Sequence, residues 1–388
     1  MGTQITARLH IGVKEILAIR EPWEKLQHHP NSDFEHYLLV CSLRKEVVSP
    51  WALSICESGQ CKAIVAGRIE DTVIQPQIGY AKLPGVKARA LQIIHEGILG
   101  EIDSQGGEAL VSSIDEMLRA RQVDMVNFHF LPERFSYLWE ALKKEDRRAA
   151  GVKNPKWSVH RALTLEKKPG FLLERMRSKH RSWVRRKEKE LLQAFSDKVK
   201  WSWDSNSIDV TSICTKMEGV AKTTYQRGLG AGFVDNDETR KTLSLFAKRN
   251  QLRVMLLEVN GQPSCFWYGV LYKSIFHASA TGYRPDMAKY EMGTLALVKT
   301  VDHLIEDGAQ KLDFGLGDAY YKERFSDISW KEASVNRFPD TIKGRFLRTY
   351  LQVISWLENN ARKFAEQIKL ADNIKKIWRM RIAAKEPK

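Results

Sequence analysis

One β-hairpin in each half of the chain constrains the fold most. In the second half, the β-rich runs Leu252–Val259 and Pro263–Tyr272 are joined by Asn260-Gly261, a dipeptide that favours the type I′ turn of a tight hairpin. In the first half, Trp51–Cys56 and Cys61–Ile69 flank the turn sequence Glu-Ser-Gly-Gln. Both halves are therefore predicted to contain antiparallel strands.

A helix and then a strand are predicted after each hairpin. Residues 88–100 and 108–121 show helical periodicity before the strand pattern of Asp124–Phe130, and the helix Gly293–Glu306 precedes the strand Lys311–Phe314. This shared order predicts two similar α/β (α+β) domains. The polar stretch Lys143–Pro155 marks the boundary between them. We expect an N-terminal domain at 1–157, a second domain at 158–341 and a tail at 342–388.

Positive charge is concentrated in two segments. The 388 residues include 62 Lys and Arg against 47 Asp and Glu, a formal charge of +15. Residues 171–190 contribute 8 cations against 3 acids, and residues 341–388 contribute 12 against 4. Such local excess favours an anionic partner, such as the phosphates of CoA, RNA or acidic lipid. The alternative is a solvated helix face without a partner.

The tail is predicted to be one long amphipathic helix over 342–382. Its apolar residues recur at spacings of three and four, from Leu347 through Ile354 and Phe364 to Ile374, with Arg and Lys on the other faces. A stripe of this kind favours docking on the protein's own body or a homodimer seam, and membrane-surface contact is the alternative.

Cysteine usage and hydropathy indicate a cytoplasmic protein. The five cysteines are scattered singly, which suits a reducing compartment and gives no zinc framework. No apolar run approaches the roughly 18 residues of a membrane-spanning helix, and the first residues do not resemble a signal peptide. We expect no metal, because no clustered His/Asp signature is present.

The most informative motif for chemistry is KLDFGLGDAYYKERFSD, at 311–327. A predicted strand carries Asp313 to its carboxyl end, two glycines follow, and Asp318, Tyr321 and Lys322 come within a few residues. Carboxylates, a phenol and a cation at a strand end favour an acid–base and anion site. In the alternative interpretation, this is a tight loop in which Asp318 caps a helix.

Three further segments are candidate binding elements. Gly293 and Thr294 stand at a predicted helix start, where amides and the helix dipole suit a pyrophosphate. The loop beginning Tyr225-Gln226-Arg227 is glycine-rich and is either a substrate contact or a connector. Arg185 lies one turn from Arg181 on the basic helix, a spacing that suits phosphate or RNA.

These residues, taken in order, resemble a known family. The sequence is similar to the CelD/BcsL-like branch of the GNAT acyltransferase superfamily, which is related in fold to the FemABX transferases. The similarity rests on Arg181-Ser-Trp-Val-Arg-Arg-Lys187, Tyr225-Gln-Arg-Gly228, Thr281-Gly-Tyr283, Gly293-Thr-Leu295, Asp313-Phe-Gly-Leu-Gly-Asp318 and Tyr321-Lys322. The resemblance covers about Ser158 to Asp327. It implies tandem GNAT-like domains, each a mixed central sheet flanked by helices, with the helical tail appended.

The resemblance also implies an activity and a site. An acyl group, acetyl first among them, would pass from acyl-CoA to an amine or hydroxyl of a small-molecule or glycan acceptor in a bacterial polysaccharide or cell-envelope pathway, in the cytoplasm or at the inner membrane. Gly293 and Thr294 would lie near the donor pyrophosphate. Asp313 or Asp318 would serve as base, Tyr321 as proton donor and Lys322 as the phosphate or oxyanion contact.

One departure from the family leaves other donors open. The common GNAT pyrophosphate loop carries two small residues, whereas Tyr290–Thr294 has one glycine. An aminoacyl-tRNA donor, as in FemABX transferases, is the second hypothesis, and the positive charge suits it. A non-catalytic envelope-pathway protein with this fold is the third.

Overall fold

The computed structural model describes residues 5–78, 81–144, 149–151, 155–206, 208–224, 227, 232–317 and 319–367. The described chain divides into two compact units. Unit 1 consists of the residues up to Val159 together with the segment that begins at Trp330, and unit 2 spans His160–Ser329. The expected boundaries differ from this division, because the strand after Ser329 pairs in the sheet of unit 1 instead of unit 2.

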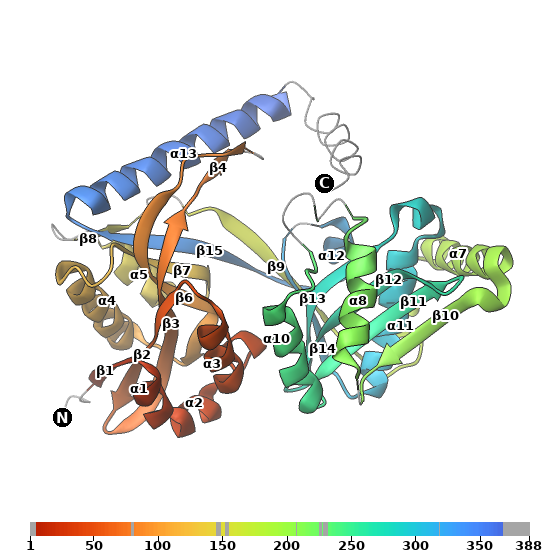
Figure 1. Ribbon diagram of the computed structural model, residues 1–388, viewed down its shortest axis with the longest axis horizontal. Helices are drawn as coiled ribbons and strands as arrows, with labels where there is room; N and C mark the ends of the chain where they lie inside the picture. The colour runs from red at the N-terminus through yellow and green to blue at the C-terminus, as the bar shows by residue number, and fades with distance from the viewer. Residues whose placement is uncertain are drawn as a thin grey trace. The chain divides into compact units, whose positions relative to one another are not determined.

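Unit 1 is a mixed sheet with helices on both faces (Figure 1). The strand order is β1-β2-β3-β6-β7-β15, in which β6 and β7 are parallel and the other neighbours are antiparallel. The strands are β1 Ile5–Ile11, β2 Val47–Glu57, β3 Gln60–Ile74, β6 Val86–Gly100, β7 Met125–Pro132 and β15 Ile328–Pro339, with β8 Ala149–Gly151 beside β15 and a small hairpin of β4 Gln77–Ile78 and β5 Ala81–Lys82.

The helices of unit 1 cover two separate cores. Helices α4 and α5 pack over one face, around Leu53, Val65 and Leu91, and α1, α2 and α3 pack over the other, around Ala52 and Ile64. Neighbouring residues of one strand thus point to opposite faces, so both faces are buried. The helices are α1 Val13–Ala18, α2 Arg20–Leu26, α3 Phe34–Leu43, α4 Ser104–Arg119, α5 Ser136–Lys143 and the tail helix α13 Ile342–Gln367.

Unit 2 repeats this order of elements. Its strands run β10-β11-β12-β13-β14-β9, with β13 and β14 parallel and the other neighbours antiparallel. They are β9 Trp157–Thr164, β10 Val199–Asp204, β11 Leu252–Val259, β12 Gln262–Tyr272, β13 Ile275–Tyr283 and β14 Lys311–Leu316. In each unit an antiparallel meander leads through one helix to a parallel strand. The topology therefore matches the predicted pair of similar α/β domains.

The helices of unit 2 also cover both faces of its sheet. Helices α6, α7 and α11 enclose one core with Leu257, Trp267 and Phe276, and α8 and α10 enclose the other with Leu256 and Phe266. The helices are α6 Phe171–Arg175, α7 Ser178–Phe195, α8 Val210–Ala221, α10 Asp237–Lys248, α11 Met292–Glu306 and α12 Tyr320–Phe325. No described helix combines the length and apolar character needed to cross a membrane.

The predicted hairpins are confirmed, and one predicted helix is wrong. Asn260 and Gly261 both have positive φ, of 54° and 71°, as a type I′ turn requires. Residues 88–100 form strand β6 instead of a helix. Its pairing with β3 opposes Ile93 to Gly67 and Ile98 to Val65, so residues 94–97 form a bulge. The extra residues break the alternation of period two and imitate helical spacing.

The tail helix α13 docks on unit 1. Leu347 is fully buried among Ala88, Met125 and Phe338, and the Tyr350 hydroxyl donates to the Pro84 carbonyl at 2.6 Å. This apolar contact anchors the described part of the helix to its own chain. The predicted stretch beyond Gln367 lies outside the described residues.

Candidate active site

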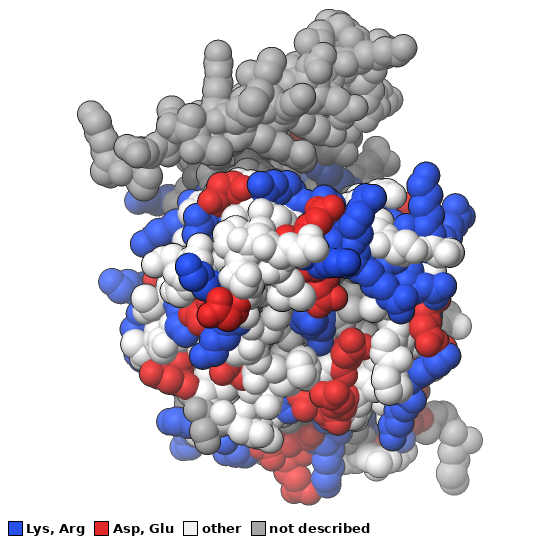
Figure 2. Space-filling model, turned by 90° about the vertical axis from the view of Figure 1, so that its right-hand side faces the viewer, with Lys and Arg blue, Asp and Glu red and all other residues white. Residues whose placement is uncertain are grey.

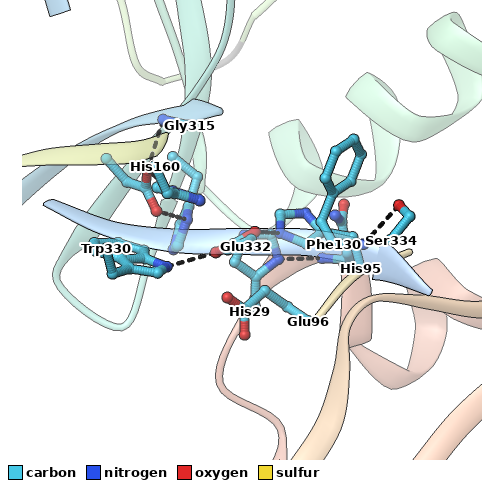
Figure 3. Close-up of polar contacts among 12 residues, drawn as sticks. His29, His95, Glu96, Phe130, His160, Gly315, Trp330, Glu332 and Ser334 are labelled. Carbon is cyan, nitrogen blue, oxygen red and sulfur yellow. Dashed lines mark hydrogen bonds and ion pairs between the residues drawn. The ribbon is translucent and has the colours of Figure 1, made fainter. Parts of the chain in front are cut away.

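A buried polar cluster of unit 2 centres on Asp313, in strand β14. His277, on the parallel neighbour β13, is its direct register partner, and His160 lies on the antiparallel neighbour β9. His160 Nε2 is 2.6 Å from Asp313 Oδ1, and His277 Nδ1 is 3.5 Å from Asp313 Oδ2. The Gly315 amide also donates to Oδ1, at 2.7 Å (Figure 3). Three adjacent strands thus bring two imidazoles to one carboxylate.

The environment keeps Asp313 ionised. Burial alone would raise the pKa of its carboxyl, but the hydrogen bonds from His160 and then His277 outweigh burial and hold that pKa well below its usual range. An ionised carboxylate can only accept hydrogen bonds, so His160 Nε2 donates to it. Whenever the His160 ring is neutral, its lone pair is therefore on Nδ1. This arrangement fixes the tautomer of an imidazole, as a base–orienter pair does.

The cluster lies where two parallel strands separate. Parallel pairing of β13 with β14 covers only 275–277 against 311–313 among the described residues, and His277–Asp313 is the last pair. Beyond it, β13 carries a bulge: Gly269 faces Ala278 and Tyr268 faces Ala280, which leaves Ser279 as the extra residue. Separated parallel strands expose backbone groups on their facing edges, to which an extended ligand can bind.

Helix α11 follows β13 and begins beside cationic side chains. Its N-cap, Glu291, has a left-handed backbone with φ of 55°. Burial raises the pKa of the Glu291 carboxyl, and the charges of Lys187 and Arg324 partly oppose that shift. A cation-flanked helix start suits an anion. The predicted residues Gly293 and Thr294 are in its first turn, where the Thr294 amide bonds the Glu291 carbonyl at 2.9 Å.

Helix α7 supplies the basic surface that the sequence indicated. Arg185 is exposed on it, whereas Val184 and Leu191 are buried against unit 2. Figure 2 views the molecule from the side on which α7 lies in Figure 1, and it shows Lys and Arg side chains interspersed with acidic ones. On α7 itself, Glu190 pairs with Lys187 at 2.8 Å. The surface is therefore mixed in sign, with cations in excess.

Two other predicted residues have contacts that orient the loop after β14. Lys322 Nζ donates to the Leu316 carbonyl at 2.6 Å. The Tyr321 ring packs edge-on against Trp267 and Phe314, with centroids 5.7 and 6.1 Å apart. Asp318 lies outside the described residues. The predicted motif thus contributes Asp313 to the cluster, and Lys322 braces the loop that follows.

The predicted substrate loop is described in part. Arg227 pairs with Glu218 at 2.6 Å and donates to the Phe233 carbonyl at 2.7 Å. These contacts close the two ends of the loop against α8. Tyr225 and Gln226 lie outside the described residues.

The sequence interpretation missed both histidines. Sequence patterns do not connect His160 or His277 with Asp313, because both are far from it in the chain. A signal was present, since each occupies a position within a β-rich run, in SVHRAL and IFHASA. Their meeting depends on the strand order β13-β14-β9, which local patterns do not reveal.

Comparison with known proteins identifies the fold of unit 2. Residues 178–323 match the family model described as an acetyltransferase (GNAT) domain. The match covers the helix α7, the parallel strands β13 and β14, and the Asp313 cluster except His160. This segment of unit 2 thus resembles a GNAT acetyltransferase domain, which supports the predicted enzyme class, an acyltransferase. No curated protein matches the chain.

The solved structures that match this chain share little sequence with it. The crystal structure of FemX shows 10% identity over 80% of this chain and 96% of its own, with a TM-score of 0.47. A GCN5-related N-acetyltransferase from Sphaerobacter thermophilus shows 11% identity over 86% and 95%, with a TM-score of 0.45. A tandem GNAT protein from the clavulanic acid biosynthesis pathway shows 7% over 85% and 98%, with a TM-score of 0.46.

Proposed function

We propose that unit 2 transfers an acyl group, acetyl first among the candidates, from acyl-CoA to an amine or hydroxyl. The observation that carries this proposal is the Asp313 cluster at the point where β13 and β14 separate. The GNAT match over 178–323 supports the reaction class. His160, His277 and Asp313 all belong to unit 2, so unit 2 is the catalytic domain in this proposal.

The donor would lie along the opening between the two strands. Its amide groups would bond to the freed backbone edges, and its diphosphate would meet the start of α11 at Gly293 and Thr294. Lys187 and Arg324 supply positive charge there, and Arg185 extends it along α7. This complementarity supports CoA as the carrier, although the sequence has only one of the two small residues of the usual GNAT loop.

The imidazoles supply the acid–base chemistry of the proposal. Asp313 is a positioning residue, because a carboxylate with a strongly depressed pKa is a weak base. It orients His160 and His277, and His277 is the more accessible of the two, with 13% of its side chain exposed against 2% for His160. His277 would accept the proton as the acceptor attacks the thioester carbonyl. The C–S bond then breaks, and the proton passes to the leaving thiolate, with Tyr321 as the proposed relay.

We propose a place at the membrane surface for the protein, consistent with the CelD/BcsL-like resemblance and an envelope pathway. Helix α13 exposes Phe346, Val353 and Trp356 by 55%, 48% and 64%, while Leu347 is buried in unit 1. Arg345 is 62% exposed on the same helix. Exposed aromatic residues on a cationic helix suit the interface of an anionic bilayer. A homodimer contact through the same residues is the alternative occupant.

Calorimetry on the full chain tests the donor. CoA, acetyl-CoA and a long-chain acyl-CoA are titrated at two salt concentrations, and the proposal expects micromolar binding by at least one of them. Transfer RNA is titrated in parallel, since an aminoacyl-tRNA donor predicts binding that weakens steeply with salt. Binding of tRNA without any binding of CoA compounds would replace the acyl-CoA proposal by the second hypothesis. Binding of neither would favour a non-catalytic role.

A further inference from the structure

Two of the five cysteines face each other across the hairpin of unit 1. Strands β2 and β3 are joined by the tight turn Ser58-Gly59, whose φ angles are 48° and 81°. Next to the turn, Glu57 is the register partner of Gln60, and Cys56 is the register partner of Cys61. Directly opposed residues of an antiparallel pair project from the same face of the sheet. The hairpin therefore brings the two thiols together.

The position of Cys56 and Cys61 suits a disulfide bond. The Cα atoms of directly opposed antiparallel residues lie about 4.5–5.5 Å apart, which falls within the roughly 4.4–6.8 Å that a disulfide spans. The two thiols are already in hydrogen-bond contact with each other. Sulfur atoms in contact can reach bonding distance by rotation of their side chains, so the bond requires little movement of the backbone.

Both thiols lie at the margin of a core and not inside it. Cys56 and Cys61 are half-buried, and Cys61 packs against the core that α1, α2 and α3 cover. Cys214 and Cys265, by contrast, are buried in unit 2. Because access to a reagent is one of the conditions for thiol chemistry, the pair in unit 1 is better placed to react than the two buried cysteines.

The environment of Cys61 suggests different roles for the two thiols. Burial, and after it the neighbouring Cys56 thiol, raises the pKa of Cys61 to about 11. Cys61 is therefore protonated at neutral pH and is a poor nucleophile toward a reagent in solution. Its contact with Cys56 offsets this handicap in an intramolecular step, because the second thiol is held beside the first. Cys61 thus suits the second step of an exchange that begins at Cys56.

We propose that Cys56 and Cys61 form a reversible disulfide across the hairpin, with a low-molecular-weight disulfide, oxidised glutathione, as the oxidant. The Cys56 thiolate attacks one sulfur of glutathione disulfide, which forms a mixed disulfide and releases the first glutathione. The Cys61 sulfur then attacks the Cys56 sulfur, and the Cys61 proton passes to the second glutathione as it leaves. Two protein thiols are oxidised, and one glutathione disulfide is reduced to two thiols.

The bond would restrain a hairpin that both cores of unit 1 share. Ile55, beside Cys56, belongs to the core under α4 and α5, and Ile64 belongs to the core under α1, α2 and α3. A disulfide at this position ties β2 to β3 near the turn and makes the hairpin sensitive to the thiol–disulfide balance around it. The proposal does not depend on the proposed function of unit 2.

Alkylation and mass spectrometry of the native full chain test the pair. The protein is equilibrated with glutathione at a series of oxidised-to-reduced ratios, alkylated and digested with trypsin. No Lys or Arg lies between Lys45 and Lys62, so the peptide 46–62 carries both cysteines. We expect this peptide to lose both alkyl groups together as oxidation increases, and to regain both after dithiothreitol. A glutathione adduct that persists on the peptide, or full alkylation at the most oxidising ratio, would overturn the proposal.

Cys41 of the same protein is the matched control. It is also half-buried, and burial raises its pKa to about 11 as well, but its side-chain hydrogen-bond neighbour is Tyr37 and not a thiol. We expect the pair to lose alkylation at a glutathione ratio about tenfold more reducing than the ratio that modifies Cys41, because closure of the pair is intramolecular. Equal loss at Cys41 would mean general oxidation and would contradict the proposal.

The variant Cys56→Ser tests the order of the two steps. It removes the first thiol and is expected to leave Cys61 alkylated at ratios that close the pair in the wild type. Loss of Cys61 alkylation at the wild-type ratio would contradict the assigned order and the need for Cys56. Disulfide-linked dimers of the wild type on a non-reducing gel would overturn a bond within one chain.

Discussion

His277 and Asp313 are register partners in the last parallel pair between β13 and β14, and their side chains meet with Nδ1 3.5 Å from Oδ2. The sheet itself therefore sets the relation of the imidazole to the carboxylate. Strands are more rigid supports than loops for such a pair. A substitution that shifts these strands near the pair should therefore lower activity, even where the substituted residue does not contact a substrate.

Gly269→Ala tests that dependence. A Cβ at Gly269 would lie 2.3 Å from the His277 carbonyl oxygen and 2.7 Å from Phe276 Cζ, so β13 must shift at His277. We expect a loss of about 1–3 kcal/mol in the free energy of unfolding, and a fall in turnover larger than the fall in donor affinity. Gly219→Ala in α8 is the matched control, since a Cβ there meets no atom within 4 Å. Normal turnover in Gly269→Ala would mean that the activity does not depend on the position of β13 at His277.

The hairpins were predictable because their turns depend on local chemistry. Asn260-Gly261 and Ser58-Gly59 both have the positive φ angles of their turns, which the dipeptides themselves favour. Strand β6 was not predictable, because its bulge at 94–97 disguises the alternation of inward and outward residues. Asp313 was identified at its strand end, but His160 and His277 depend on which strands become neighbours. Which strands become neighbours depends on how both faces of the sheet are buried. This is a property of the whole unit, so local sequence patterns do not reveal it.

Docking of α13 on unit 1 predicts a large effect at Leu347. Leu347 is fully buried with Ala88, Met125 and Phe338, so Leu347→Ala leaves a cavity and is expected to lower the free energy of unfolding by about 2–5 kcal/mol. Urea denaturation measures this change. A loss below about 0.5 kcal/mol, the usual size for a surface substitution, would mean that the helix does not dock there in solution.

Substitutions on the exposed side of α13 should weaken binding to lipid vesicles without changing the free energy of unfolding. The double variant Phe346→Ala, Trp356→Ala is expected to unfold like the wild type but to lose most of its sedimentation with phosphatidylglycerol-containing vesicles, because about 25 cal/mol is lost per Å² of apolar burial. Tyr137→Ala, which removes an exposed aromatic ring of α5, is the control. The dimer alternative would be favoured by two results together. The wild-type protein would form dimers without binding anionic vesicles, and the double variant would be monomeric.

His129 should make the protein less stable on mild acidification. Burial, the largest cause, and the charge of Arg68 lower the pKa of His129 to about 4, from about 6.5 in the unfolded chain. Between these values the unfolded chain binds the proton and the folded chain does not, so stability falls as pH drops from about 6.5 toward 4. His129→Asn should reduce that loss by on the order of 2 kcal/mol. If the wild type and His129→Asn show the same dependence of unfolding free energy on pH, a group other than His129 causes the loss of stability.

The most direct test of the proposed function is acyl transfer by Asp313→Asn. Release of free CoA from acetyl-CoA is followed with a panel of amine and hydroxyl acceptors, alongside calorimetric binding of acetyl-CoA. We expect turnover to fall about 10²–10⁴-fold with donor affinity within about threefold of the wild type, because asparagine keeps the shape and loses the charge that orients both imidazoles. Wild-type turnover in Asp313→Asn would contradict the assignment of this cluster as the catalytic centre.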